Sequence, residues 1–158
     1  PWSEDLSGLS VGVVSPLANE MLAQYRSRNM LFASDFDILP EMRLSALTPP
    51  MTHGLSISRR SWVSNLRNMV ETSCRSFAKS DLVLISAGSY GMPLASHLTE
   101  RGLRAIYLGG CLQLLFGISG RRWRTNDEIQ SVSTPKWIDP PANSRPLGHR
   151  LIEGGAYW

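Results

Sequence analysis

Three short apolar runs, each followed by a small-residue turn and a helical or glycine-rich pattern, constrain the fold of this chain more than any other feature. They lie at residues 11–14, 81–85 and 105–108. Apolar, β-branched runs of this length are typical of strands that are covered on both faces. Strand, helix and strand joined by short loops form the crossover unit of a parallel sheet. We therefore expect an α/β, Rossmann-like fold with a mostly parallel sheet and helices on both faces.

Helical patterns fill the spaces between these strands. Ser15 and Pro16 suit the N-cap and the first position of a helix whose apolar residues recur every four positions. A second helix is expected over 61–79, and a third over 93–101 with Gly102 just beyond its end. The buried stripe predicted for the second helix consists of Trp62, Leu66, Met69, Val70, Ser73 and Phe77.

The rest of the chain has weaker patterns. Alternation of apolar and polar residues predicts another strand at 42–46, and a short helix is expected at 111–116. Residues 124–158 are rich in proline and polar residues, so we expect an irregular C-terminal wrap over the surface. A length of 158 residues with 42% hydrophobic content favours a single α/β domain, 1–158. Because the chain starts at Pro1, we expect it to be a processed or excised piece of a longer protein.

Charge and composition limit the kinds of partner that we expect for this chain. The net charge is +3, and all positive residues except Lys79 and Lys136 are arginines. No basic run with interleaved aromatics occurs, so we do not expect nucleic acid as a partner. No apolar run approaches the ~20 residues that cross a bilayer, which predicts a cytoplasmic protein with no transmembrane segment. Cys74 and Cys111 match neither a disulfide framework nor a zinc motif.

A glycine-rich loop, "SAGSYG", follows the strand at 81–85. Parallel sheets bind ligands beyond the carboxyl ends of their strands, and this loop, Ser15 and the segment from Gly109 onward all stand at such ends. The loop matches only half of the dinucleotide fingerprint, which disfavours a nicotinamide enzyme. Its small residues and the following helix start suit an anion, although a tight packing turn would need the same glycines. The candidate binding residues here are Ser86, Gly88, Ser89, Tyr90 and Gly91.

A second candidate is "GGCLQLLFGISGRRWR". Guanidinium groups beside an indole can clamp a diphosphate and stack on a ring. A solvated basic loop covered by its tryptophan would give the same pattern. The candidate binding residues here are Gly109, Gly110, Gln113, Arg121, Arg122 and Trp123.

Acidic residues supply two further hypotheses. Asp35 and Asp37 form a DxD pair of the kind that holds Mn²⁺ or Mg²⁺ against a diphosphate, although such pairs also occur by chance. Glu20 and Glu153 could act as a general base or bind a hydroxyl, and isolated carboxylates are more often surface charges.

Four stretches, "VGVVSPLANEMLAQYRSRNMLF", "LISAGSYGMPLASHL", "GLRAIYLGGCLQLLFGISGRRW" and "EGGAYW", together resemble a bacterial family found near polysaccharide and sugar-transfer genes. That family has versions of "GAGAYGLPLA", "AIHLGGATQLLFGIKGKRW" and "VEGGCYW" in this order. Its glycine-turn half is similar to the GT-D type of glycosyltransferase. The resemblance implies a nucleotide-sugar and a saccharide acceptor as partners.

This chain departs from the family pattern at several positions. Ser86 and Ser89 stand where alanine or glycine is common, and Tyr107 stands where histidine is usual. Longer members carry an N-terminal acidic motif upstream of the segment that begins here at Pro1, so the resemblance implies that this chain is the C-terminal part of a longer protein. The leading hypothesis is a glycosyltransferase-like domain that binds a nucleotide-sugar diphosphate. The alternatives are a non-catalytic α/β binding or interaction module and a hydrolase of nucleosides or phosphosugars.

Overall fold

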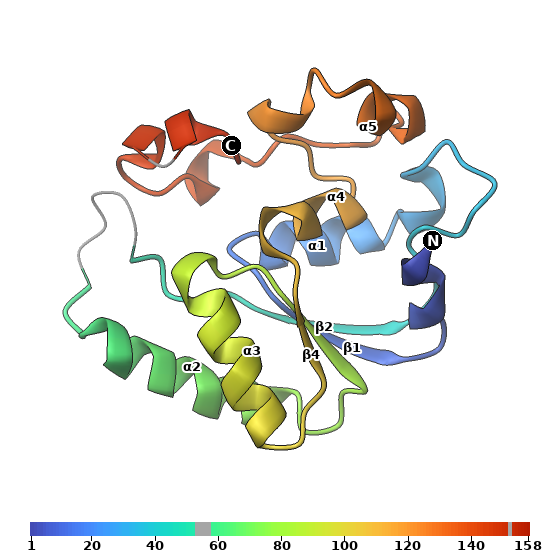
Figure 1. Ribbon diagram of the computed structural model, residues 1–158. Coiled ribbons are helices and arrows are strands. Elements are labelled where there is room, and N and C mark those ends of the chain that lie inside the picture. Colours follow the sequence, from blue (N-terminus) through green and yellow to red (C-terminus); the bar gives the residue numbers. More distant parts are fainter. Residues whose placement is uncertain (53–57, 152) are drawn as a thin grey trace.

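Four parallel strands form the centre of the molecule (Figure 1). The computed structural model describes residues 1–52, 58–151 and 153–158. The strands are β1 (Ser10–Val14), β2 (Arg43–Leu47), β3 (Leu82–Ile85) and β4 (Ala105–Tyr107), in the order β2-β1-β3-β4. Every neighbouring pair is parallel. The predicted α/β fold with a parallel sheet is confirmed.

Helices cover both faces of this sheet, as expected (Figure 1). Helix α1 (Ala18–Tyr25) and the short α4 (Leu112–Leu115) contribute to the hydrophobic cluster on one face. Helices α2 (Trp62–Ser76) and α3 (Gly91–Glu100) contribute to the cluster on the other. The remaining helix, α5 (Asp127–Val132), lies in the C-terminal part of the chain.

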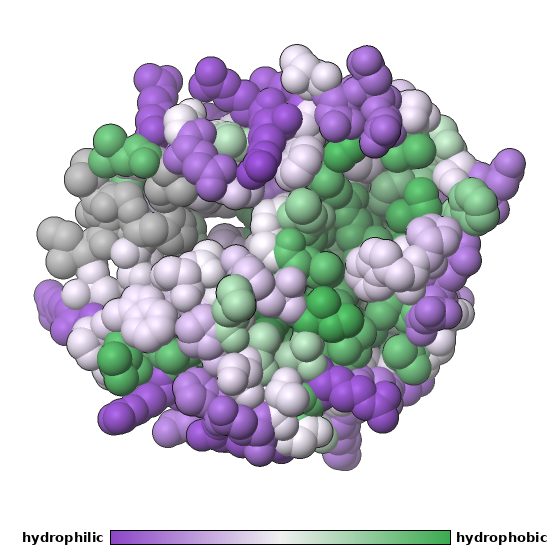
Figure 2. All heavy atoms as spheres, in the orientation of Figure 1, coloured by the Kyte–Doolittle hydropathy of each residue, from purple (hydrophilic) through white to green (hydrophobic). Residues whose placement is uncertain are grey.

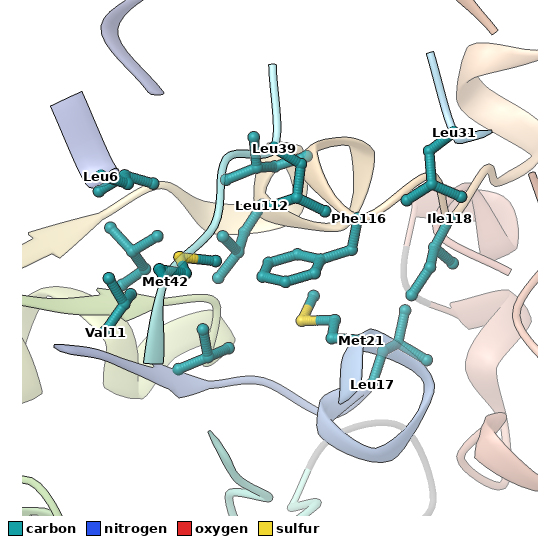
Figure 3. Close-up of a cluster of buried hydrophobic side chains, with 13 residues drawn as sticks. Leu6, Val11, Leu17, Met21, Leu31, Leu39, Met42, Leu112, Phe116 and Ile118 are labelled. Atoms are coloured by element: carbon teal, nitrogen blue, oxygen red, sulfur yellow. The ribbon is translucent and has the colours of Figure 1, made fainter. Parts of the chain in front are cut away.

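The sheet separates two clusters of buried side chains because successive strand residues point to opposite faces. Figure 3 shows the cluster under α1 and α4, where the Phe116 ring lies between Leu112 and Met21. Val11 reaches this cluster from β1, whereas Val14 reaches the other. The second cluster consists of Val14, Leu66, Met69, Val70, Phe77, Val83, Ile85, Ala87, Tyr90, Leu94 and Leu98.

Gly12 allows close packing between β1 and α2 on one face of the sheet. A Cβ atom on Gly12 of β1 would lie 2.6 Å from the Phe77 ring. Phe77, at the end of α2, is only 1% exposed and has no room to move outward. Gly12 therefore lets α2 and β1 pack closely.

Two predicted helix starts were wrong. Helix α1 begins at Ala18 with Leu17 as N-cap, because the hydroxyl of Ser15 accepts the Leu17 N–H (3.1 Å) in a tight turn before the helix. Helix α3 begins at Gly91, directly after a 3₁₀ turn at Gly88–Tyr90, and so two residues before the expected position.

Two other expectations also need correction. The helical periodicity predicts Trp62 on the buried stripe of α2, but Trp62 is 42% exposed at the first position of the helix. The C-terminal region is less irregular than predicted, because Asn126 caps α5 by accepting the Ile129 N–H (2.9 Å). Among the described residues, no helix combines the length and apolar character needed to cross a membrane.

Candidate functional site

A pocket of about 340 Å³ lies where the chain leaves β1 and β3 in opposite directions. After β1 the chain turns toward β2, and after β3 it turns toward β4. The loops that follow these adjacent strands therefore separate and leave a space at the carboxyl edge of the sheet. Such switch points are the usual ligand sites of open parallel sheets.

Four segments line this pocket. The loops that follow β1, β3 and β4 supply three of them, as predicted. The fourth is the C-terminal segment 153–158, which lies over the start of α3 where Figure 2 shows a hollow in the surface. The lining residues are Ser15, Pro16, Leu17, Ser86, Ala87, Gly88, Ser89, Tyr90, Tyr107, Gly109, Gly110, Gln113, Glu153, Tyr157 and Trp158.

The glycine turn presents free backbone donors to the pocket. Gly88 has a φ of 52°, a left-handed conformation that glycine adopts at low cost. Within the described part of the chain, the N–H groups of Gly88 and Ser89 have no backbone or side-chain acceptor. The turn continues into α3, so these donors form the start of a longer helical segment. A helix start of this kind favours a negatively charged group.

Tyr90 anchors the turn from the side of α2. Its ring stacks on Trp62, with the centroids 5.1 Å apart and the planes at 11°. Its hydroxyl is hydrogen bonded to Thr52 (2.8 Å) and accepts from Asn65 (3.5 Å). Because the hydroxyl already has protein partners, Tyr90 positions the turn more than it offers a polar group to a ligand.

Two motif glycines provide room for aromatic rings of the pocket. A Cβ atom on Gly91 would overlap the ring of Tyr107, and one on Gly110 would overlap the ring of Tyr157. Neither Gly91 nor Gly110 has a positive φ, so the constraint at both is space. The Tyr107 hydroxyl also donates to the carbonyl of Gly88 (3.4 Å). The glycines thus set the positions of two walls of the pocket.

Gln113 supplies a fixed hydrogen-bond acceptor. The residue is 4% exposed, and its Nε2 donates to the carbonyl of Ser119. Its Oε1 receives no hydrogen bond from the described residues, and it is not among their fully buried unpaired atoms. Since Gln113 lines the pocket, its amide oxygen is open to a ligand there.

A carboxylate, a phenol and a guanidinium form a network at the C-terminal wall. Arg122 Nη1 donates to Glu153 Oε2 and to the Tyr157 hydroxyl, both at 3.3 Å, and that hydroxyl donates to Glu153 Oε1 (3.3 Å). Burial, followed by the negative charge of Glu153, raises the pKa of Tyr157, and Arg122 opposes this increase. The network holds Tyr157 as a neutral phenol and orients the carboxylate.

Most of the predicted binding residues meet in this pocket. Ser15 is 1% exposed, its oxygen accepts the Leu17 N–H, and its hydroxyl proton has no acceptor among the described residues. The predicted residues that line the pocket are Ser15, Ser86, Gly88, Ser89, Tyr90, Gly109, Gly110 and Gln113.

The predicted arginine clamp lies behind the C-terminal segment instead of in the pocket. Arg121 donates to the Gly154 carbonyl (3.4 Å), and the Arg122 guanidinium lies 5.2 Å from the centre of the Trp123 ring. The Trp123 Nε1 is buried and has no hydrogen-bond partner among the described residues. These three residues support the wall and are not part of the lining.

The predicted metal pair lies elsewhere. Asp35 and Asp37 belong to the exposed connection that leads into β2, at the opposite edge of the sheet from the pocket (Figure 1). In the part of the chain that the structure describes, no group of three or more His, Cys, Asp or Glu side chains could hold a metal ion. Glu20, on α1, is also absent from the lining.

Sequence reasoning missed the aromatic half of the pocket. Tyr107, Tyr157 and Trp158 all line it. The sequence indicates Glu153 as a possible general base but does not assign it to this pocket. The signal was the compact group "EGGAYW", which places a carboxylate, two glycines and two aromatics at the end of a polar tail.

Comparisons of this chain with protein-family models, with curated proteins and with solved structures gave no match. The chemistry of the pocket therefore carries the functional interpretation.

Proposed function

We propose that this pocket binds a nucleotide sugar and that the domain acts in sugar transfer. One observation supports this proposal above all: the two sides of the pocket differ in hydrogen-bonding character. The turn side offers donors, the N–H groups of Gly88 and Ser89 and the hydroxyl of Ser15. The opposite side offers acceptors on Gln113 and Glu153. A sugar phosphate has the complementary pattern, an anionic acceptor at one end and hydroxyl donors at the other.

The phosphate groups belong at the turn. Consecutive backbone N–H groups at a helix start bind phosphate oxygens without a charged side chain. No lysine, arginine or histidine is among the described residues that line the pocket. Neutral donors, aided by the dipole of α3, would hold the diphosphate.

The size of the pocket suits the sugar and the phosphates. Its volume of about 340 Å³ is near the lower end of the range for small-molecule sites. Tyr107 lines the pocket and is 39% exposed, so its ring offers a stacking surface for the base outside the enclosed part.

Glu153 is the residue best placed to assist transfer. It has the only side-chain carboxylate among the described lining residues. In the proposed reaction the bond between the anomeric carbon and the phosphate oxygen breaks, and the acceptor hydroxyl oxygen forms a new bond to that carbon. The hydroxyl proton passes to Glu153 and the nucleoside diphosphate leaves. Asp35 and Asp37 do not fit a metal that serves this pocket, so no step passes through them.

A non-catalytic binding module is the second candidate. The ion pair between Glu153 and Arg122 (3.3 Å) favours it, because a carboxylate that a guanidinium already holds is suited to bind a hydroxyl without taking its proton. Both candidates share the same pocket and the same ligand.

Calorimetry with UDP- and GDP-sugars tests the proposal. We expect binding to the wild-type chain and at least a tenfold loss in Gly91→Asp, where the new side chain displaces the Tyr107 ring. Ser96→Asp adds the same charge at an exposed position of α3 and should bind like the wild type. A folded wild-type chain that binds none of these sugars would contradict the proposal.

Turnover separates the two candidates. If the domain is a transferase, Glu153→Gln should keep sugar-nucleotide binding and lose release of the nucleoside diphosphate. If it is a binding module, the wild-type chain should bind the sugar nucleotide and release no diphosphate with any acceptor.

A further inference from the structure

We infer that the glycosyl group bound by this pocket is uncharged, and that a sugar carrying a carboxylate is rejected. This inference rests on the proposed function and names the class of sugar. It follows from the charges of the lining, from the positions of the acceptors and from the contacts of Arg122.

The first argument is charge. Among the described residues that line the pocket, Glu153 has the only charged side chain, and it is negative. The phosphates must already be held by neutral donors at the Gly88 turn. A second anionic group, placed on the sugar, would lie near Glu153, and the described lining has no cationic side chain to compensate it. Like charges at short distance in a partly enclosed site disfavour binding.

The second argument is hydrogen bonding. Gln113 Oε1 and the Glu153 carboxylate are both acceptors on the wall opposite the turn. Sugar hydroxyls donate to such groups, whereas a carboxylate on the sugar has no proton to donate at neutral pH. Gln113 cannot simply turn its amide to present Nε2, because Nε2 is held by the Ser119 carbonyl inside the protein.

The third argument concerns Arg122, the cation that contacts Glu153. Arg122 lies outside the lining, and its Nη1 donates to Glu153 and to Tyr157, both at 3.3 Å. A carboxylate on the ligand would compete with Glu153 and Tyr157 for this guanidinium, and it would lie next to the negative charge of Glu153. An uncharged sugar leaves the network intact.

Aromatic rings complete the case for a neutral sugar. Tyr157 and Trp158 line the same wall and pack against each other, with centroids 6.1 Å apart. Aromatic faces favour the apolar C–H side of an uncharged sugar ring and offer nothing to a carboxylate, since the face of an aromatic ring is itself electronegative.

The test uses pairs of ligands that differ only at C6 of the sugar, where a carboxylate replaces the CH2OH group. UDP-glucose and UDP-glucuronic acid are titrated into the full chain by calorimetry, and GDP-mannose with GDP-mannuronic acid form a second pair for the other base. We expect the neutral member of the pair to bind about tenfold or more tightly. In Glu153→Gln the difference should shrink, because the uronic acid gains affinity when the negative charge is removed.

Salt dependence of the wild-type chain gives an independent measurement that needs no variant. The phosphates are common to both ligands, so the ratio of the two dissociation constants reports the change at C6, and its salt-dependent part reports the sugar charge. This ratio should fall toward one as salt screens the repulsion. Equal affinities at low salt, or an unchanged ratio in Glu153→Gln, would overturn the inference and leave the proposed function standing. If the folded chain binds none of these ligands, both the inference and the proposed function are contradicted.

Discussion

At the scale of single residues, the glycines of this chain serve mainly to admit aromatic rings. Gly91 accommodates Tyr107, Gly110 accommodates Tyr157 and Gly12 accommodates Phe77. Gly88 and Gly109 each combine a place in the pocket with a left-handed backbone, and within the described residues their N–H groups have no backbone acceptor. A sequence shows that a glycine is present but not which ring lies against it, so the motif predicts a phosphate cradle or a tight packing turn and does not identify the rings.

Gly110→Ala tests this role. The added methyl group overlaps the Tyr157 ring, so we expect a loss of about 1–3 kcal/mol in unfolding free energy and weaker sugar-nucleotide binding. Tyr157→Ala removes the ring, and in that background Gly110→Ala should cost little. Urea unfolding of the four proteins gives the coupling energy, and additive effects would mean that the ring does not need the glycine.

The pKa of Tyr157 provides a test of the network. Its raised pKa means that the fold favours the neutral phenol, so this contribution to stability is intact below the ordinary pKa of 10.0 and is lost as pH rises through the raised pKa. Phenolate absorbance, with Tyr157→Phe to assign the signal, should show ionisation above pH 10.0. Glu153→Gln should lower this pKa and Arg122→Gln should raise it. Shifts in the same direction would contradict the network.

At the scale of elements, periodicity predicted the strands and most helices. The apolar runs of β1 and β3 and the stripe of α2 are dictated by burial on two faces of a sheet, which the sequence records directly. The helix boundaries that periodicity did not predict depend on local hydrogen bonds. The Ser15 turn delays α1, and the Asn126 cap starts α5 within a region that lacks apolar periodicity.

Gly12→Ala tests the packing of α2 on the sheet. The new methyl group meets the Phe77 ring at 2.6 Å, so unfolding free energy should fall by about 1–3 kcal/mol. Ser96→Ala, a change at an exposed position of α3, is the matched control and should change stability by less than about 0.5 kcal/mol. A stability for Gly12→Ala equal to that of the control would mean that Phe77 has room to move.

At the scale of the whole molecule, the edge of the sheet that carries the pocket could be predicted, and its fourth wall could not. Strand order brings the loops after β1, β3 and β4 to one edge by a general rule. The wall made by Glu153 and Tyr157 depends on contacts with Arg122, about thirty residues earlier in an aperiodic tail. Such contacts leave no local pattern in a sequence.

Deleting residues 153–158 should therefore separate folding from binding. The fully buried residues of both core clusters all precede Ser119, so the shortened chain should keep its circular dichroism spectrum and a cooperative transition. It should lose sugar-nucleotide binding, because one wall of the pocket is gone. Binding that survives the deletion would place the ligand elsewhere.

The most direct test of the central claim, that a sugar nucleotide lies between the glycine turn and the C-terminal segment, is an amide NMR titration of the wild-type chain with UDP-glucose. The account predicts saturable shifts at Gly88 and Ser89 on one wall and at Tyr157 on the other, while amides of Asp35 and Asp37 stay in place. Shifts that leave Gly88 and Ser89 unchanged, or no shifts at all with a folded chain, would contradict it.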